Sequence, residues 1–253
     1  MKKIAMITGA TSGIGEATAQ RFAREGYNLI ITGRRADRLD ALKESLEASS
    51  GARVLALNFD VRNRAECEAA VESIPQDFRT IDVLVNNAGL ASGLEHIELG
   101  NPDDWDAMID TNVKGLMYIT RVVSKIMIDN GRGHIINLGS IAGTQAYENG
   151  AAYCASKHAV HALSQGMRID LLKKGIKVTE VRPGMVETEF SVVRFHGDKA
   201  KADAVYNGVK PLVAEDIAET IYWAVSLPAH VNIDDIVMTP VAQANAYYTH
   251  RSN

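Results

Sequence analysis

Short apolar runs alternate with longer stretches of helical period along the chain, and this alternation restricts the fold more than any other feature. The runs are rich in β-branched residues and apolar on both faces, which is typical of strands in a parallel sheet covered by helices on each side. The predicted strands are Ile4–Thr8, Asn28–Thr32, Arg53–Asn58, Asp82–Val85, His134–Leu138, Lys177–Arg182 and Ile236–Thr239.

The chain gives no sign of a domain boundary. Its 253 residues contain no internal repeat, no low-complexity tract and no linker rich in Pro, Gly or Ser. A chain of this length can bury a sizeable single core. We therefore expect one α/β domain over residues 1–253, with right-handed crossovers between its parallel strands.

Charge and cysteine content exclude several classes of function. The net charge is -4 and charged residues make up 23% of the chain, which disfavours nucleic acid and anionic membrane as partners. The apolar run Ile4–Ile7 is too short for a signal sequence or a membrane span, so a cytoplasmic location is expected. Only Cys67 and Cys154 are present, without CxxC spacing, and the histidines are scattered. Neither a disulfide framework nor a metal site is indicated.

A glycine-rich turn follows the first predicted strand and precedes the helical stretch Glu16–Glu25. Glycines there permit a tight turn and a close approach of backbone to phosphate, and free N–H groups of the next helix attract the anion. The spacing differs from G-x-G-x-x-G, but the placement predicts nucleotide binding. The residues expected to bind are Gly9, Thr11, Ser12, Gly13, Ile14 and Gly15.

Two arginines end the second strand where a dinucleotide fold usually presents an acidic residue to the ribose. Arg34 and Arg35 are suited to clamp a ribose 2′-phosphate through charge-assisted hydrogen bonds, which favours NADP over NAD. The alternative is a solvated basic start to the helix Ala36–Ser49, with Asp37 and Asp40 as counter-ions.

Polar and small residues also follow the third and fourth strands, at the edge where an open α/β sheet binds its ligand. Asp60, followed by Val61, is placed to accept a hydrogen bond from adenine. Asn87, Ala88 and Gly89 allow a cofactor to lie close to backbone. Asp60 is equally suited to cap the helix Arg62–Ser73.

A possible acid/base pair lies on one helix. Tyr153 and Lys157 are four residues apart, which places a phenol and an ammonium on the same helix face. Nearby positive charge makes a tyrosine a better base, because it stabilises the phenolate. A surface pair is the alternative.

Two further polar residues are candidates for the same site. Ser140 follows the fifth strand and delivers a hydroxyl to the same sheet edge. Asn112 falls in the middle of the helical stretch Pro102–Asn130, where an asparagine marks a kink, is a functional group, or is simply a surface amide.

Taken in order, these residues resemble the classical short-chain dehydrogenase/reductase family over nearly the whole chain. The motifs are T8GxxxGxG15, Asp60, N86NAG89, Asn112, Ser140, Y153xxxK157 and P183G184. The resemblance implies a doubly wound Rossmann fold with a seven-stranded parallel sheet and helices on both faces. It also implies an oxidoreductase that acts on a small molecule.

The resemblance further implies individual roles at the site. Tyr153 exchanges a proton with the substrate oxygen, and Ser140 hydrogen-bonds that oxygen. Lys157 holds the nicotinamide ribose and lowers the pKa of the tyrosine, so both residues also bind cofactor. Asn112 positions a water in a proton relay. The turn after the sixth strand lines the nicotinamide through Pro183, Gly184, Val186 and Thr188.

A narrower resemblance is to the NADP-dependent 3-hydroxy acid dehydrogenases, also described as serine or L-allo-threonine dehydrogenases. It is carried by T32GRR35, D60VRN63, M108IDTN112, T188EFS191 with V193RF195, and L227PAHVNI233. It implies oxidation of a hydroxyl β to a carboxylate, or reduction of the semialdehyde, in a homotetramer. Val186-Glu187 before Thr188 and Cys154-Ala155-Ser156 after Tyr153 are mild departures that leave the chemistry intact.

The segment 189–211 has the length and polarity of a substrate lid. A hydroxy acid needs a cation for its carboxylate, and Arg194 in this segment offers a bidentate partner. The alternative is that the charges of this segment are simply solvated. Gln145 and Tyr147, on the loop after Ser140, are further candidates for the substrate pocket.

Two other functions fit the same motifs. One is a reductase of ketones, sugars or 3-oxoacyl thioesters, which differs mainly in the lid. The other is a non-catalytic NADP-sensing protein. A sensor needs no phenol and ammonium pair, so Ser140, Tyr153 and Lys157 favour an enzyme.

Overall fold

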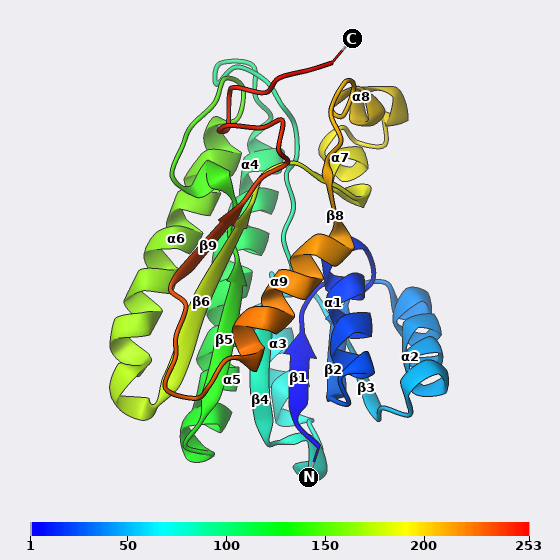
Figure 1. The fold of residues 1–253 in the computed structure, drawn as a ribbon, viewed down its shortest axis with the longest axis vertical. Helices are drawn as coiled ribbons and strands as arrows, with labels where there is room; N and C mark the ends of the chain where they lie inside the picture. Colours follow the sequence, from blue (N-terminus) through cyan, green and yellow to red (C-terminus); the bar gives the residue numbers. More distant parts are fainter. Residues whose placement is uncertain (1, 253) are drawn as a thin grey trace.

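The computed structural model describes residues 2–252 and contains one central sheet of seven parallel strands (Figure 1). The strand order is β3-β2-β1-β4-β5-β6-β9. The strands are β1 (Ile4–Ile7), β2 (Asn28–Gly33), β3 (Val54–Asn58), β4 (Ile81–Asn86), β5 (Gly133–Leu138), β6 (Ile176–Pro183) and β9 (Asp235–Met238). The predicted strands and the doubly wound topology are confirmed, and each strand end differs from its predicted position by at most one residue.

Helices cover both faces of this sheet (Figure 1). On one face lie α1 (Gly13–Arg24), α2 (Ala36–Ser50) and α9 (Ala214–Ser226). On the other lie α3 (Arg64–Glu72), α5 (Leu116–Asp129) and α6 (Ala151–Leu171). Short 3-10 turns span Gln76–Phe78, Ile141–Gly143 and Leu172–Lys174. No helix within residues 2–252 has the length and hydropathy to cross a bilayer.

Strand β1 shows why the apolar runs lacked a polar alternation. Ala5 and Ile7 pack in the core beneath α1, α2 and α9, whereas Ile4 and Met6 pack in the core beneath α3 and α5. Successive side chains of a strand point to opposite faces. Because both faces are covered by helices, every residue of β1 is buried.

The strand order reverses between β1 and β4, since β2 and β3 lie on one side of β1 and β4, β5, β6 and β9 on the other. In open α/β sheets a ligand binds outside the carboxyl ends of the strands at such a switch point. The glycine-rich turn after β1 and the N86NAG89 segment after β4 meet there.

The predicted helix Pro102–Asn130 is helical but not uniformly α-helical. It contains α4 (Pro102–Ile109), a π-helical turn (Asp110–Gly115) and α5. Thr111 and Asn112 are buried in the π turn. A π turn widens the helix and is frequent at functional sites, so the mid-helix asparagine does mark a local irregularity.

The predicted lid is more ordered than a loop. It contains α7 (Glu189–Arg194) and α8 (Lys199–Ala204). The strands β7 (Val186–Glu187) and β8 (Leu212–Val213), which the sequence did not predict, pair in parallel at its two ends. The pairing of β7 with β8 brings the two ends of residues 189–211 together, so α7 and α8 lie between two adjacent strands.

The alternative role of Asp60 as a helix cap is wrong. Helix α3 begins at Arg64, and its cap is Asn63, whose side chain accepts hydrogen bonds from Ala65 and Glu66. The Asp60 carboxylate instead accepts from Arg62 at 2.6 Å, which leaves it at the edge of the sheet.

Candidate active site

The glycine-rich turn is held against the end of β4 by one asparagine. The side-chain amide of Asn87 donates to the carbonyl oxygens of Thr8 at 2.8 Å and Gly9 at 3.0 Å. A Cβ atom at Gly15 would lie 2.3 Å from the Gly9 oxygen and 2.4 Å from Asn87 Nδ2. Gly15 is therefore required for close packing of α1 on this turn.

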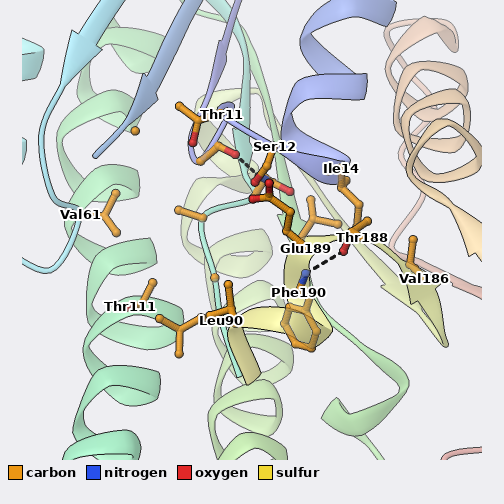
Figure 2. Close-up of a pocket in the computed structure, with 18 of the residues that line it drawn as sticks. Thr11, Ser12, Ile14, Val61, Leu90, Thr111, Val186, Thr188, Glu189 and Phe190 are labelled. Carbon is orange, nitrogen blue, oxygen red and sulfur yellow. Dashed lines mark hydrogen bonds between the residues drawn. The ribbon is translucent and has the colours of Figure 1, made fainter. Parts of the chain in front are cut away.

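A cavity of about 330 Å³ opens above the carboxyl ends of the strands (Figure 2). It is lined by nearly all of the residues predicted to bind cofactor, the exception being Gly15, which lies behind the turn. The lining includes Gly9, Thr11, Ser12, Gly13, Ile14, Arg34, Arg35, Asp60, Val61, Asn87, Ala88, Gly89, Tyr153, Lys157, Pro183, Gly184, Val186 and Thr188.

Two buried hydroxyl groups on the lining of this cavity have no hydrogen-bond partner among residues 2–252. They belong to Thr32 at the end of β2 and Thr111 in the π turn. A buried polar group without a partner costs free energy, so a polar ligand in the cavity fits these groups. Sequence reasoning missed Thr111, although its neighbour Asn112 marked the same turn.

The second arginine of the pair contacts the glycine-rich turn directly. Arg35 Nη2 donates to Ser12 Oγ at 2.9 Å and to Thr11 Oγ1 at 3.0 Å. Its counter-ion is Glu189, whereas the interpretation as a solvated helix start expected Asp37 or Asp40. Arg34 lies 3.8 Å from Asp60. Both guanidinium groups border the cavity.

Tyr153 and Lys157 are buried, which excludes the interpretation as a surface pair. Their exposed fractions are 9% and 7%. Lys157 Nζ donates to the carbonyl oxygen of Leu138, the last residue of β5, at 2.8 Å, and Ser140 follows two residues later. One strand end therefore supplies both the serine and the acceptor that positions the lysine.

Burial dominates the acid/base properties of this pair. It lowers the pKa of Lys157 to about 8, and the carboxylate of Glu180 opposes this change. Burial also raises the pKa of Tyr153 above its ordinary range, whereas the Ser140 hydroxyl and the charge of Arg194 lower it. Two cations lie beside the phenol ring: the Arg194 guanidinium carbon is 5.5 Å and Lys157 Nζ is 5.9 Å from its centroid.

Asn112 does not line the cavity but fixes the backbone that does. Its amide accepts from the N–H of Leu90 and donates to the oxygen of Leu90, both at 2.8 Å. It also donates to Ser156 Oγ, between Tyr153 and Lys157, at 3.0 Å. Asn112 thus joins the π turn, the segment after β4 and helix α6.

The residues predicted to bind substrate do not all lie beside Tyr153. Arg194, the last residue of α7, donates to the Tyr147 hydroxyl at 2.9 Å and lines a second cavity of about 20 Å³ together with Tyr153. Gln145 lies elsewhere, because its side chain accepts from the N–H of Ala246 at 2.8 Å in the C-terminal tail. Ser140 lines the main cavity.

Several residues at the site were given no role from the sequence, although Phe190 and Val193 lie in the motifs of the narrower resemblance. Phe190 packs edge-on against Tyr153 with ring centroids 5.7 Å apart, and Val193 lines the cavity nearby. Gln243 accepts from the N–H of Met185 at 2.8 Å and fixes the turn after β6. These contacts join segments far apart in the chain, so no local sequence pattern predicts them.

One acidic cluster lies away from the cavity. His161 Nδ1 is 2.6 Å from Glu180 Oε2 and 3.9 Å from Asp235 Oδ1. Three such side chains are a possible set of metal ligands. Arg182 already lies 3.2 Å from Asp235, so a cation is present beside the carboxylates.

Comparison with known proteins agrees with this geometry. A model of the short chain dehydrogenase family matches residues 3–198. The NADP-dependent 3-hydroxy acid dehydrogenase YdfG of Salmonella typhi is 49% identical over 98% of this chain and 100% of its own length. Sulfoacetaldehyde reductase 2 of Chromohalobacter salexigens is 45% identical over 96% of each chain.

A solved structure, the closed form of serine dehydrogenase complexed with NADP+, superimposes with a TM-score of 0.93 at 45% identity. The match covers 98% of this chain and 100% of that one. The family model, the near full-length relatives and the geometry around Tyr153 and Lys157 lead to one conclusion: this chain belongs to the short-chain dehydrogenase family.

Proposed function

We propose that the chain is an NADP-dependent oxidoreductase that interconverts the hydroxyl group of a 3-hydroxy acid and the corresponding carbonyl. The observation that carries the proposal is the position of Arg194, whose guanidinium carbon lies 5.5 Å from the ring centroid of the buried Tyr153. A cation beside the proton-transfer group suits a substrate with an anionic group close to its hydroxyl. The relatives named for 3-hydroxy acids and serine support this assignment.

The cavity fits NADP in three respects. The Asn87-bound turn presents Gly9 and Gly13 with positive φ, as a phosphate-binding turn needs. The buried hydroxyls of Thr32 and Thr111, on the cavity lining, have no partner among the described residues, as expected of groups that bond to a polar ligand. Arg34 and Arg35 provide cations at the end of β2, and we assign them to the 2′-phosphate.

The residues of the chain manage the proton and the position of the substrate. When bound, NADP supplies the hydride exchange. During oxidation Tyr153 accepts the hydroxyl proton, and during reduction it returns the proton. Ser140 hydrogen-bonds the same oxygen. Lys157 holds the cofactor ribose and favours the phenolate, while Asn112 positions a water for the proton relay and fixes Leu90 beside them.

The substrate carboxylate binds to Arg194 on this proposal. Tyr147 orients the guanidinium through its hydroxyl, and the carbonyl oxygen of Gly93 accepts from Nε at 3.3 Å. Phe190 and Val193, on the same helix, exclude water from one side. We further propose that residues 189–211 act as the substrate lid.

Oxidation assays with the purified protein and NADP+ test this function. The panel contains serine, L-allo-threonine, 3-hydroxybutyrate, 3-hydroxyisobutyrate and 2-propanol, and the readout is NADPH formation. The 3-hydroxy acids are expected to give the highest kcat/KM. Preference for the uncharged alcohol, or for the reduction of 3-oxoacyl thioesters, would favour another reductase. NADPH binding without turnover of any substrate would favour a sensor.

A second candidate substrate is an aldehyde that carries a sulfonate. The relative named sulfoacetaldehyde reductase 2 is 45% identical over 96% of this chain. A sulfonate is an anion that the same guanidinium can bind in a bidentate manner. Oxidation of 2-hydroxyethanesulfonate, compared with 3-hydroxybutyrate under the same conditions, separates the two candidates.

We also propose a homotetramer that works in the cytoplasm. Large apolar side chains are exposed on α6, α9, β9 and the C-terminal tail, which is expected of surfaces between subunits. They include Ile169, Leu172, Trp223, Val237, Tyr247 and Tyr248. The two cysteines are buried and free, as a reducing compartment allows. Light scattering on the purified protein should give four times the mass of one chain.

A further inference from the structure

A carboxylate of the lid, that of Glu189, forms ion pairs with two arginines near the end of β2. Glu189, the first residue of α7, lies 3.0 Å from Arg35 Nη1 and 2.8 Å from Arg38 Nη1. Figure 2 shows Glu189 beside Ser12 and Thr188. Its side chain is 45% exposed, so these ion pairs are open to competition by a soluble anion.

The two arginines are well placed to exchange one anion for another. Arg35 keeps Nη2 on Thr11 and Ser12 while its Nη1 binds Glu189. Arg38 lies in the first turn of α2 and binds only Glu189 among the described residues. The Arg38 hydrogen bond lowers the pKa of Glu189, which keeps this carboxylate ionised at neutral pH.

Helix α7 connects this ion pair to the residues around Tyr153. It begins at Glu189 and ends at Arg194, and its cap is Thr188. The helix has six residues, so its two ends are about 8 Å apart. The carboxylate bound to Arg35 and Arg38 and the cation beside Tyr153 therefore belong to one short helix.

We propose that Glu189 is an internal competitor for the 2′-phosphate of NADP, and that binding of this phosphate to Arg35 and Arg38 releases the first turn of α7 from α2. The proposal rests on the assignment of Arg35 to the 2′-phosphate and adds Arg38, which shares Glu189 with Arg35. It makes Glu189 and Arg38 determinants of the choice between NADP and NAD. It also means that binding of the cofactor 2′-phosphate changes the contacts of the lid, residues 189–211.

A binding experiment with cofactor fragments tests the competition. The ligands are adenosine 2′,5′-bisphosphate, which carries the 2′-phosphate, and adenosine 5′-phosphate, which does not. Neither contains nicotinamide, so closure around that ring does not contribute. In Glu189→Gln the dissociation constant for the bisphosphate should fall about threefold to tenfold, because two exposed ion pairs no longer compete. The constant for the monophosphate should stay within about twofold.

Two further variants separate this proposal from the assignment on which it rests. Glu187→Gln removes an exposed carboxylate two residues earlier, and its affinities should match the wild type. Arg35→Ala should weaken binding of the bisphosphate alone. If Arg35→Ala has no effect, the arginine assignment fails. If Arg35→Ala weakens binding and Glu189→Gln leaves it unchanged, only the competition by Glu189 is wrong.

Hydrogen exchange of residues 190–194 tests the release of α7. In the wild type, adenosine 2′,5′-bisphosphate should accelerate exchange of these amides, whereas the monophosphate should not. In Glu189→Gln exchange should already be fast and should not respond to either ligand. Equal exchange in the wild type with and without the bisphosphate would overturn the release.

Discussion

The guanidinium carbon of Arg194 lies 5.5 Å from the ring centroid of Tyr153, although the two residues come from different helices. The same group lies 5.6 Å from the ring of Tyr147 and donates to its hydroxyl. A cation held over an aromatic ring favours the charged form of a nearby phenol. Arg194 is therefore positioned to serve both the substrate anion and the proton-transfer group.

Removal of Arg194 should affect anionic substrates far more than neutral ones. Arg194→Ala is expected to raise the KM for 3-hydroxybutyrate about tenfold to a hundredfold, because a charge-assisted contact is lost. The KM for 2-propanol should change little. Equal effects on both substrates would show that Arg194 does not bind the carboxylate.

The pH profile of the same variant gives an independent readout. The charge of Arg194 lowers the pKa of Tyr153, so its removal should raise this pKa. Oxidation needs the phenolate as base, and its rate should rise with pH in both proteins. In Arg194→Ala the rising limb should shift to higher pH. An unchanged profile would assign Arg194 to substrate binding alone.

Replacement of the phenol should stop the chemistry without harming the cavity. Tyr153→Phe removes one oxygen and keeps the ring that packs on Phe190. We expect kcat to fall by about a hundredfold or more, since general acid/base catalysis is lost. NADPH affinity, measured by fluorescence, should remain near the wild-type value. Retention of a tenth of the activity would contradict the role of Tyr153.

The arginine pair should control cofactor choice. In the double variant Arg34→Asp, Arg35→Ala the KM for NADP should rise at least about tenfold, because charge-assisted bonds to the 2′-phosphate are lost. The KM for NAD should change much less, since NAD has a hydroxyl at this position. Steady-state kinetics with both cofactors make the comparison. Equal increases in the KM for NADP and for NAD would show that Arg34 and Arg35 do not bind the 2′-phosphate.

The buried charge of Lys157 should lower the free energy of unfolding. Burial lowers its pKa from 10.5 to about 8, so the charged amine destabilises the fold below about pH 8, and this cost fades as the pH rises toward 10.5. Lys157→Met should raise the unfolding free energy at pH 7 by about 1–3 kcal/mol, after allowance for the lost bond to Leu138.

Urea denaturation of the cofactor-free protein measures this effect. The gain from Lys157→Met should shrink near pH 10, because the native amine is then neutral. Lys174→Met, at an exposed position at the end of the helix, serves as the control and should change stability little at either pH. A less stable Lys157→Met at pH 7 would mean that packing outweighs the charge.

A methyl group at Gly15 should disrupt the phosphate-binding turn. The added Cβ would meet the Gly9 backbone oxygen at 2.3 Å and the Asn87 amide nitrogen at 2.4 Å, so the turn would have to shift. Gly15→Ala should lose about 1–3 kcal/mol of unfolding free energy and bind NADPH more weakly. Melting curves with and without NADPH separate the two effects. A variant with wild-type stability and affinity would show that the turn can relax.

The sequence by itself determined the fold class and the local parts of the site. Buried apolar runs specify a parallel sheet, the turn after Ile7 specifies a phosphate-binding loop, and four-residue spacing places Tyr153 and Lys157 on one helix face. Each of these depends on residues close together in the chain. Local backbone preferences and hydrophobic periodicity therefore predict them.

Only the tertiary structure decided which distant side chains meet. It placed Arg194 over Tyr153, Glu189 on Arg35 and Arg38, and Asn112 on the backbone of Leu90. It also directed Gln145 to the C-terminal tail and gave the α3 cap to Asn63, not Asp60. These contacts depend on how α7 packs across the sheet edge and on the π turn. Ion pairs and hydrogen bonds between such segments follow from packing geometry, which no local spacing encodes.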